Sequence, residues 1–382
     1  DASHVAYYDN SQSVYVIDLK TGVATKVGSN KVYTPLQLIS TAWSPDSRWL
    51  AYTVNTHTLV TSLFAYNVAD NKSTRVTDGL SAVRDPAFDK SGKYLYVVAS
   101  TDAGPQLDWF AQSSTNLPIS ASIYAIVLRR DLPNPFERES DEEKGVATRP
   151  DSAVPAPGAA PAPAAGATTA TPNAAPRPAA AAPTRIDFDG IEQRIVAFPI
   201  PAANISNIEA GEAGMLYYQR SADGTNVLRR FDVNKRTDAV FVPLFGGRYY
   251  LSADAKKILY ESQGGWFVAA TTTPPVVGTG RLATADIEVK IDPRAEWRQI
   301  YDEAWRINRD YFYAPNMHGV DWLAAKRKYE QFLPDATTKA DVNRVIQWLM
   351  SELSVGHHRG GGGDRITTPR AVPGGLLGVD YS

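Results

Sequence analysis

The sequence predicts a mainly β protein, a β-propeller, that is followed by a small α-helical module. A tight polar turn recurs at a fixed spacing between short runs in which apolar and polar residues alternate. A second strand pattern recurs beside that turn. After residue 292 the apolar period lengthens from two to between three and four, the spacing of amphipathic helices.

The repeated turn first occurs within residues 41–52, as a strand end, a polar turn and an alternating strand. Residues 86–97 repeat it 45 positions later, and residues 252–260 form a weaker copy. The second pattern, a strand that ends in a turn, is found at residues 13–18, 62–67 and 231–235. A period of about 40–50 residues made of short strands is typical of propeller blades.

A propeller explains these repeats because each sheet buries both faces against its neighbours and the ring removes exposed sheet edges. A β-sandwich with similar turns is the alternative, but we expect a sandwich seldom to repeat one turn at fixed spacing. In the propeller interpretation the turns at Asp46-Ser47 and Ser91-Gly92 are structural, with side chains that cap the turn backbone.

Residues 137–184 interrupt the repeats. The stretch begins with acidic residues and continues almost entirely in Ala, Pro, Thr and Gly. This composition has too little apolar bulk to offset the entropy lost on ordering, so it predicts a disordered insertion between blade strands. We interpret the insertion as a spacer, with partner docking as the alternative. Alternating runs at 185–189, 194–199 and 281–291 predict further strands.

The first predicted helix opens at Asp292-Pro293, since Pro is favoured in the first turn. Its spacing of apolar residues indicates one buried, strongly aromatic face. That face is predicted to contain Trp297, Ile300, Tyr301, Ala304, Trp305, Asn308, Tyr311 and Phe312.

A second helix is expected over residues 321–333, and a third begins at Thr338, whose capping box is completed by Asp341. Gly356 is the expected left-handed residue at the end of the third helix. His357 follows directly. An imidazole at the end of a packed helix, with glycines beyond it, suits a general base beside a cleft, and the helix C-terminus would favour its protonated form.

Composition excludes several classes of function. The chain has 382 residues and no Cys, which excludes disulfides, thiolate nucleophiles and Cys-based zinc sites. Its net charge of -2 gives no indication of nucleic-acid binding. No run of about 20 apolar residues predicts a membrane span. The chain begins without Met and ends in a strand-like run, so we interpret it as a fragment of a longer protein, with no secretory signal visible.

The spacing of residues argues against a metal site and against a phosphate-binding loop. The adjacent His357 and His358 could suggest a metal, but neighbouring rings rarely reach one ion and no His-Glu-x-x-His occurs. The glycines at 360–363 lack the Lys-Ser/Thr of a phosphate-binding loop, so we interpret them as a flexible connector. No cofactor is expected.

Four segments together resemble tricorn-type serine peptidases, which are related to carboxyl-terminal processing peptidases. They are the turn at residues 44–46, residues 186–201, residues 296–322, and Glu-Leu-Ser-Val-Gly-His at 352–357. Propeller repeats occur in many families, whereas the helical module that ends in Glu-Leu-x-x-x-His is more specific. The resemblance covers nearly the whole chain except the Ala/Pro-rich insertion.

The resemblance implies a series of domains: propeller, helical module, PDZ domain and α/β core. It places a propeller, incomplete at its N-terminus, at residues 1–291 and a helical module at 292–366. The start of a PDZ domain would occupy 367–382, because residues 373–380 resemble its first strand.

The resemblance also implies site roles. The family's His at this motif is the general base for a Ser nucleophile, and the role falls on His357, with His358 as the alternative. The family usually has a Ser where this chain has Gly356, so either the ordering hydrogen bond comes from elsewhere or the site works differently. His318, in a turn before Gly319, is interpreted as structural. The nucleophilic Ser, its acidic partner and the oxyanion donors belong to the α/β core, outside this chain.

By this resemblance the full-length protein is a serine endopeptidase whose propeller gates peptide or unfolded protein substrates. This chain alone is predicted to be inactive. Association into a homo-oligomer is left open. A cytoplasmic location is favoured by the resemblance, with a periplasmic or secreted one as the alternative because the N-terminus is missing. The alternative function is a non-catalytic propeller scaffold that binds peptides or a partner protein.

Overall fold

The computed structural model describes residues 3–32, 39–100, 120–137, 183–222 and 224–363. The chain divides into two compact units, one ending at Leu282 and one starting at Ala283. The predicted PDZ strand and nearly all of the predicted insertion lie outside the described residues. Among the residues described, no helix is long and apolar enough to cross a membrane.

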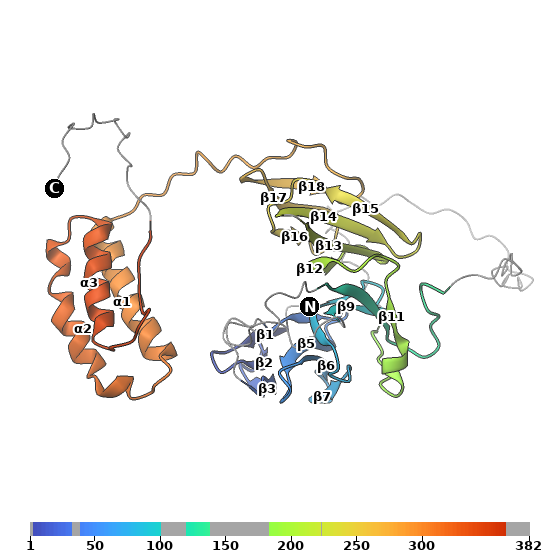
Figure 1. Ribbon diagram of the computed structural model, residues 1–382, viewed down its shortest axis with the longest axis horizontal. Helices are drawn as coiled ribbons and strands as arrows, with labels where there is room; N and C mark the ends of the chain where they lie inside the picture. The colour runs from blue at the N-terminus through green and yellow to red at the C-terminus, as the bar shows by residue number, and fades with distance from the viewer. Residues whose placement is uncertain (1–2, 33–38, 101–119, 138–182, 223, 364–382) are drawn as a thin grey trace, which may run out of the picture. The chain divides into compact units, whose positions relative to one another are not determined.

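The described part of the first unit contains five antiparallel sheets, each with its strands in sequence order (Figure 1). The first sheet contains β1 (His4–Tyr8), β2 (Ser13–Asp18) and β3 (Ala24–Ser29), and the second β4 (Thr41–Trp43), β5 (Trp49–Asn55), β6 (Thr61–Asn67) and β7 (Lys72–Arg75). The third contains β8 (Ala82–Phe88), β9 (Tyr94–Ser100), β10 (Ser122–Val127) and β11 (Ile195–Ala197). The fourth contains β12 (Asn204–Ala210), β13 (Met215–Ala222), β14 (Thr225–Asp232) and β15 (Thr237–Val242), and the fifth β16 (Tyr249–Leu251), β17 (Lys257–Ser262) and β18 (Gly265–Ala270).

The three copies of the repeated turn occupy equivalent places in this arrangement. They connect β4 to β5, β8 to β9, and β16 to β17, so each joins the first two strands of its sheet. The second pattern corresponds to β2, β6 and the end of β14, which are inner strands of the first, second and fourth sheets. The repeats therefore mark successive sheets of one architecture.

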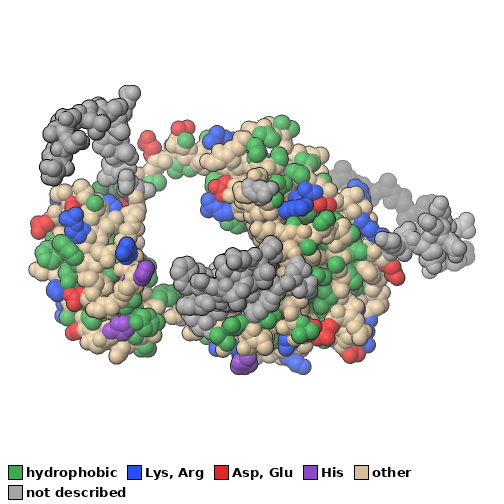
Figure 2. Space-filling model, in the orientation of Figure 1, with side chains coloured by type: hydrophobic (Ala, Val, Ile, Leu, Met, Phe, Trp, Pro, Cys, Tyr) green, Lys and Arg blue, Asp and Glu red, His purple; other side chains and the backbone are tan. Residues whose placement is uncertain are grey.

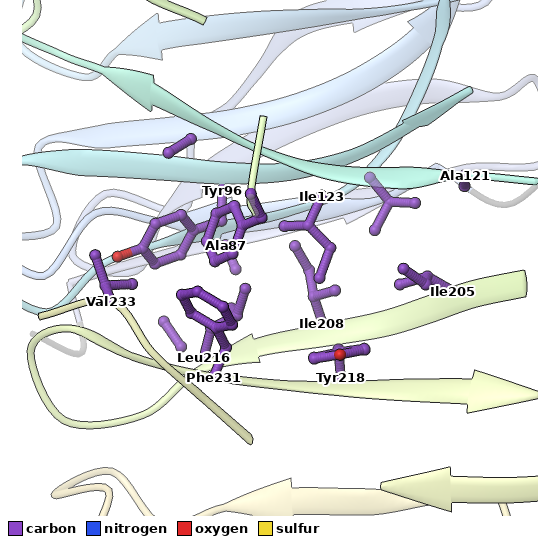
Figure 3. Close-up of a cluster of buried hydrophobic side chains, with 14 residues drawn as sticks. Ala87, Tyr96, Ala121, Ile123, Ile205, Ile208, Leu216, Tyr218, Phe231 and Val233 are labelled. Carbon is purple, nitrogen blue, oxygen red and sulfur yellow. The ribbon is translucent and has the colours of Figure 1, made fainter. Parts of the chain in front are cut away.

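Buried apolar clusters lie between successive sheets, and the alternation along each strand explains how. In β5, Leu50 and Tyr52 face the cluster shared with the first sheet, whereas Ala51 faces the cluster shared with the third. Figure 3 shows the next cluster, in which Tyr96 and Phe231 come from the third and fourth sheets. A sheet between two neighbours therefore buries both of its faces, as a propeller blade does.

In two of the repeated turns an Asp carboxylate also binds outside its own turn, Asp89 in the neighbouring sheet and Asp46 in the irregular segment before β11. One oxygen of Asp89 caps its own turn, and the other accepts hydrogen bonds from the Tyr96 hydroxyl and, in the next sheet, from the Gly214 amide at 2.8 Å. Asp46 accepts from its own turn and from the Thr184 amide at 2.7 Å. Burial and the neighbouring Asp89 raise the pKa of Tyr96, which keeps its hydroxyl protonated as a donor.

The third sheet is completed across the predicted insertion. Ala125 in β10 pairs with Val196 in β11, although more than sixty residues of sequence separate them. The two ends of the inserted segment are therefore fixed by one antiparallel ladder.

Two of the predicted strands are wrong. Residues 185–189 are irregular, and their alternation arises because Ile186 and Phe188 pack into the core without a strand partner. Residues 281–291 form no strand beyond an isolated bridge at Arg281. Alternation shows that a segment has two distinct faces, but a strand also needs a neighbour to form its ladder.

The second unit packs three α-helices around one core. They are α1 (Pro293–Tyr311), α2 (Trp322–Glu330) and α3 (Lys339–Ser351), with the short turns η3 (Met317–Gly319) and η4 (Leu333–Asp335) between them. The side chains of Asp292, Asp321 and Thr338 cap the three helices by accepting backbone amides, and the predicted capping box is present.

Aromatic side chains fix α1 against α2. The indoles of Trp305 and Trp322 each donate to the other's backbone carbonyl, at 2.9 and 3.0 Å, and the Tyr301 hydroxyl donates to a carbonyl of α2. Tyr311 departs from the predicted buried face, because its side chain is 65% exposed in the last turn of α1. The second helix also ends earlier than predicted, at Glu330.

The contact between neighbouring sheets at Asp89 gives a stability prediction. Asp89→Ala leaves the buried Tyr96 hydroxyl and Gly214 amide without an acceptor, which we expect to cost about 2–4 kcal/mol of unfolding free energy. Asp254→Ala is the matched control, since Asp254 caps the equivalent turn in the fifth sheet and is exposed. It should cost about 1 kcal/mol or less. Urea unfolding measures both, and equal losses would contradict the role of Asp89 between sheets.

Candidate functional site

The segment after α3 contains both predicted site residues. The helix ends at Ser351, and the left-handed residue that follows is Ser354, at φ 53°, rather than the predicted Gly356. His357 is itself left-handed, at φ 61°. His357 therefore lies six residues past the last residue of α3, and does not follow the helix end directly as predicted.

The start of this segment is tied to α2 by Glu352. Its carboxylate accepts hydrogen bonds from the Lys328 ammonium and the Tyr329 hydroxyl, both at 2.6 Å. The Lys328 hydrogen bond, followed by that of Tyr329, holds the pKa of the Glu352 carboxyl below its ordinary value. The acidic residue of the motif is therefore a tether between helices in this structure.

His318 holds the next residue of the segment. Its Nδ1 atom lies 3.0 Å from the Leu353 carbonyl oxygen, to which it donates, and its Nε2 atom accepts from the Tyr313 hydroxyl at 2.6 Å. The ring also meets Phe312 edge-on, with centroids 5.1 Å apart. Both ring nitrogens are thus engaged by the protein, as a structural role requires.

The His357 side chain is exposed to solvent. Among the described residues, neither of its ring nitrogens has a hydrogen-bond partner. Figure 2 shows imidazole side chains at the surface of the helical unit. A Cβ atom built on Gly356 would meet nothing within 4 Å, so the backbone here has open space where the family's Ser would stand. The His357 ring is therefore accessible to solvent and engaged by no described residue.

His358, by contrast, is held on several sides. Its Nε2 atom lies 2.8 Å from Oδ1 of Asn308, and its carbonyl accepts from the Gln347 amide at 3.3 Å. The ring lies against Phe312, with centroids 6.2 Å apart. The Nδ1 atom is buried and has no partner within the described part of the chain.

The glycines after His358 lie along α3. A Cβ atom on Gly360 would approach Met350 and Ile346 to 3.2 and 3.3 Å. The Asn343 amide donates to the Gly362 carbonyl at 3.1 Å. We call residues 358–363 the glycine strap. These residues lie against α3, and the interpretation of the glycines as a connector to a further domain stays a prediction.

Among the described residues, no hydroxyl or carboxylate hydrogen-bonds to His357. The described part of the chain therefore shows no hydrogen-bonded pair of a nucleophile and a base at this position. No group of three His, Asp or Glu side chains that could hold a metal ion occurs in the described ranges.

One contributor to this site, Asn308, had been predicted only as part of the buried face of α1. An amide on an otherwise apolar helix face is an available signal, because buried polar groups are nearly always hydrogen-bonded. The sequence contains no indication of its partner, which lies 50 residues away.

Comparison with known proteins identifies the family. The model described as "Tricorn protease second beta propeller domain" matches residues 1–272, which is most of the chain. The chain belongs to the tricorn protease family. A second model, "Tricorn protease C1 domain", matches residues 293–351, the three helices of the second unit.

Individual relatives agree with this assignment. "Tricorn protease homolog 1" of Streptomyces coelicolor is 27% identical over 417 residues, covering 100% of this chain and 35% of the relative. "Tricorn protease homolog" of Saccharolobus solfataricus is 21% identical over 397 residues, covering 100% of this chain and 33% of the relative. The crystal structure of the tricorn protease has the same fold, with a TM-score of 0.69 at 18% identity over 93% of this chain and 32% of that one.

The predicted resemblance and the predicted fold class, mainly β with a small helical region, are confirmed. The names of the relatives describe proteases, so the family is one of peptidases. The chain spans about a third of the length of these relatives. The C1 match ends at residue 351, before His357 and His358, so the roles of both remain predictions.

The contact of the glycine strap with α3 can be tested by a matched pair. Gly360→Val forces a side chain against Met350 and Ile346, which we expect to lower stability by about 1–3 kcal/mol and to speed amide exchange across the strap. Gly361→Val is the control, because a Cβ atom there meets nothing within 4 Å. Hydrogen exchange by mass spectrometry measures both, and an equal response of the two variants would argue against the contact.

Proposed function

We propose that this chain is the propeller and adjoining helical part of a serine-type peptidase in which His357 is the general base. The nucleophilic Ser, the acidic partner and the oxyanion donors would come from polypeptide outside this chain. The observation that carries the proposal is an exposed imidazole without a partner among the described residues, six positions after the C1 domain match of a tricorn family member.

In this proposal the chemistry is acyl transfer to water. A free nitrogen of His357 takes the proton from the Ser hydroxyl as its oxygen attacks the peptide carbonyl, and then gives that proton to the leaving amine. Water repeats the sequence on the acyl-enzyme. The propeller would admit extended peptide or unfolded protein substrates, and association of several copies stays a prediction.

Accessibility favours His357 over the alternative, His358. A general base must come within hydrogen-bond reach of the hydroxyl whose proton it takes. The Nε2 atom of His358 is occupied by Asn308, and its Nδ1 atom is buried. His357 has neither obstacle.

The general base can be tested in the full-length protein. Because loss of a triad member costs on the order of 10⁶ in kcat, His357→Ala should reduce peptide hydrolysis to near background. His57→Ala, at an exposed His of the propeller unit, is the control and should keep wild-type turnover. Hydrolysis is measured with a fluorogenic peptide. Near-normal turnover by His357→Ala would remove this assignment, and its loss in His358→Ala alone would transfer the role to His358.

The 382-residue chain should be inactive by itself, because it presents a base without a nucleophile. We expect no peptide hydrolysis and no labelling by a fluorophosphonate, which reacts with activated Ser. Full-length protein is the positive control. Stoichiometric labelling of one Ser in the 382-residue chain would contradict the proposal. An inert full-length protein that still binds peptides would favour the scaffold alternative.

A further inference from the structure

We propose that His358 is a positioning residue, whose ring is fixed by Asn308 so that the loop presents His357 in one conformation. The inference rests on the proposed function of His357 as the base. It concerns a contact between α1 and the first residue of the glycine strap, and it supplies the ordering that Gly356 has no side chain to provide.

The orientation of the Asn308 amide follows from its own hydrogen bonds. Its Nδ2 group donates to the Ala304 carbonyl one turn earlier in α1, at 2.8 Å, which directs Oδ1 toward the strap. Oδ1 is an acceptor, so the Nε2 atom of His358 at 2.8 Å must carry a proton. His358 is therefore anchored as the Nε2–H tautomer through a single defined bond.

Phe312 connects this anchor to a second one. It is the residue that ends α1, and the rings of His318 and His358 both lie against it, with centroids 5.1 and 6.2 Å away. His318 in turn holds the Leu353 carbonyl. The loop is thus held at both ends, by one imidazole at Leu353 and by the other at residue 358 itself.

The backbone at His357 needs such support. A left-handed residue other than Gly costs about 1–2 kcal/mol, and at φ 61° His357 lies in that region. A residue keeps this conformation only where surrounding contacts offset the conformational free energy. The contacts nearest to His357 are those of its neighbour, the ring bond to Asn308 and the carbonyl bond to Gln347. Without them the loop can relax and move the base.

The anchor is tested first in the 382-residue chain, with diethyl pyrocarbonate, which modifies accessible neutral imidazoles, and mass spectrometry. In the wild type, His357 should react fast, and His318 and His358 slowly. Asn308→Leu should raise the rate at His358 about 10-fold or more by opening its ring nitrogens. Asn308→Asp keeps an acceptor for His358 but loses the donation to the Ala304 carbonyl, so it should recover most, though not all, of the protection. Asn343→Leu, which removes the amide contact to the Gly362 carbonyl and leaves the contacts of His358 in place, is the control and should leave His358 protected.

The positioning role is then tested by steady-state kinetics in the full-length protein. Because displacement of a catalytic group by about 1 Å costs on the order of 10²-fold, Asn308→Leu should lower kcat about 10- to 100-fold with little change in KM. Asn308→Asp should recover most of kcat. If Asn308→Leu also exposes His318, its fold is perturbed, and His358→Ala takes its place, with the same expected fall in kcat at unchanged KM.

The outcomes separate this inference from the proposed function. His358 labelling that stays slow in Asn308→Leu overturns the anchor, whatever the activity. Labelling that rises while kcat stays at the wild-type value overturns the positioning role. Full activity of His357→Ala overturns the proposed base and leaves the anchor to be judged by labelling alone.

Discussion

Burial of both faces of each inner sheet is the constraint on which the first unit depends. Side chains on β5 contribute to two clusters at once, Leu50 toward the first sheet and Ala51 toward the third. A sheet of this kind is stable only between two neighbours, so no sheet can fold its core alone. The Asp89 carboxylate adds a directional contact between sheets. One oxygen accepts from Ser91 in its own turn, and the other accepts from Gly214 in the first turn of the fourth sheet. Apolar burial thus supplies most of the cohesion, and the carboxylate helps to set the register between neighbours.

In the helical unit, contacts from α1 and α2 and from the turn between them hold the loop that follows α3. The reciprocal indole bonds of Trp305 and Trp322 fix α1 against α2, and Asn308 lies on the same helix less than one turn after Trp305. Glu352 ties the end of α3 to α2. The residues that hold His358 therefore sit on elements that the aromatic core already makes rigid, which is where a site can be placed accurately.

Sequence predicted this fold well where a local pattern repeats and poorly where distant segments meet. The turns before β5, β9 and β17 share a signature because each faces the same packing problem. Residues 185–189 alternate like a strand, yet they have no ladder partner, which only the assembled sheets could reveal. The role of His357 was predicted from its motif and stays a prediction. The contact between Asn308 and His358 was not predicted, because two residues 50 positions apart share no local signal. The end of the third helix was misplaced, because Ser354 and not Gly356 adopts the left-handed conformation.

A general base in a hydrolase must be accessible and also held in place. In this loop the side chain of His357 meets the first requirement, and the contacts of neighbouring residues meet the second. The His357 ring is exposed and has no hydrogen-bond partner among the described residues, while its backbone is held by contacts that belong to Leu353 and His358. Each net hydrogen bond contributes about 1 kcal/mol, so a few of them offset the left-handed strain of about 1–2 kcal/mol at His357. A side chain at position 356 is then unnecessary for order. On the proposed function, Gly356 is therefore compatible with a working base at His357, because the hydrogen bond between His358 and Asn308 takes the place of an ordering side chain at position 356.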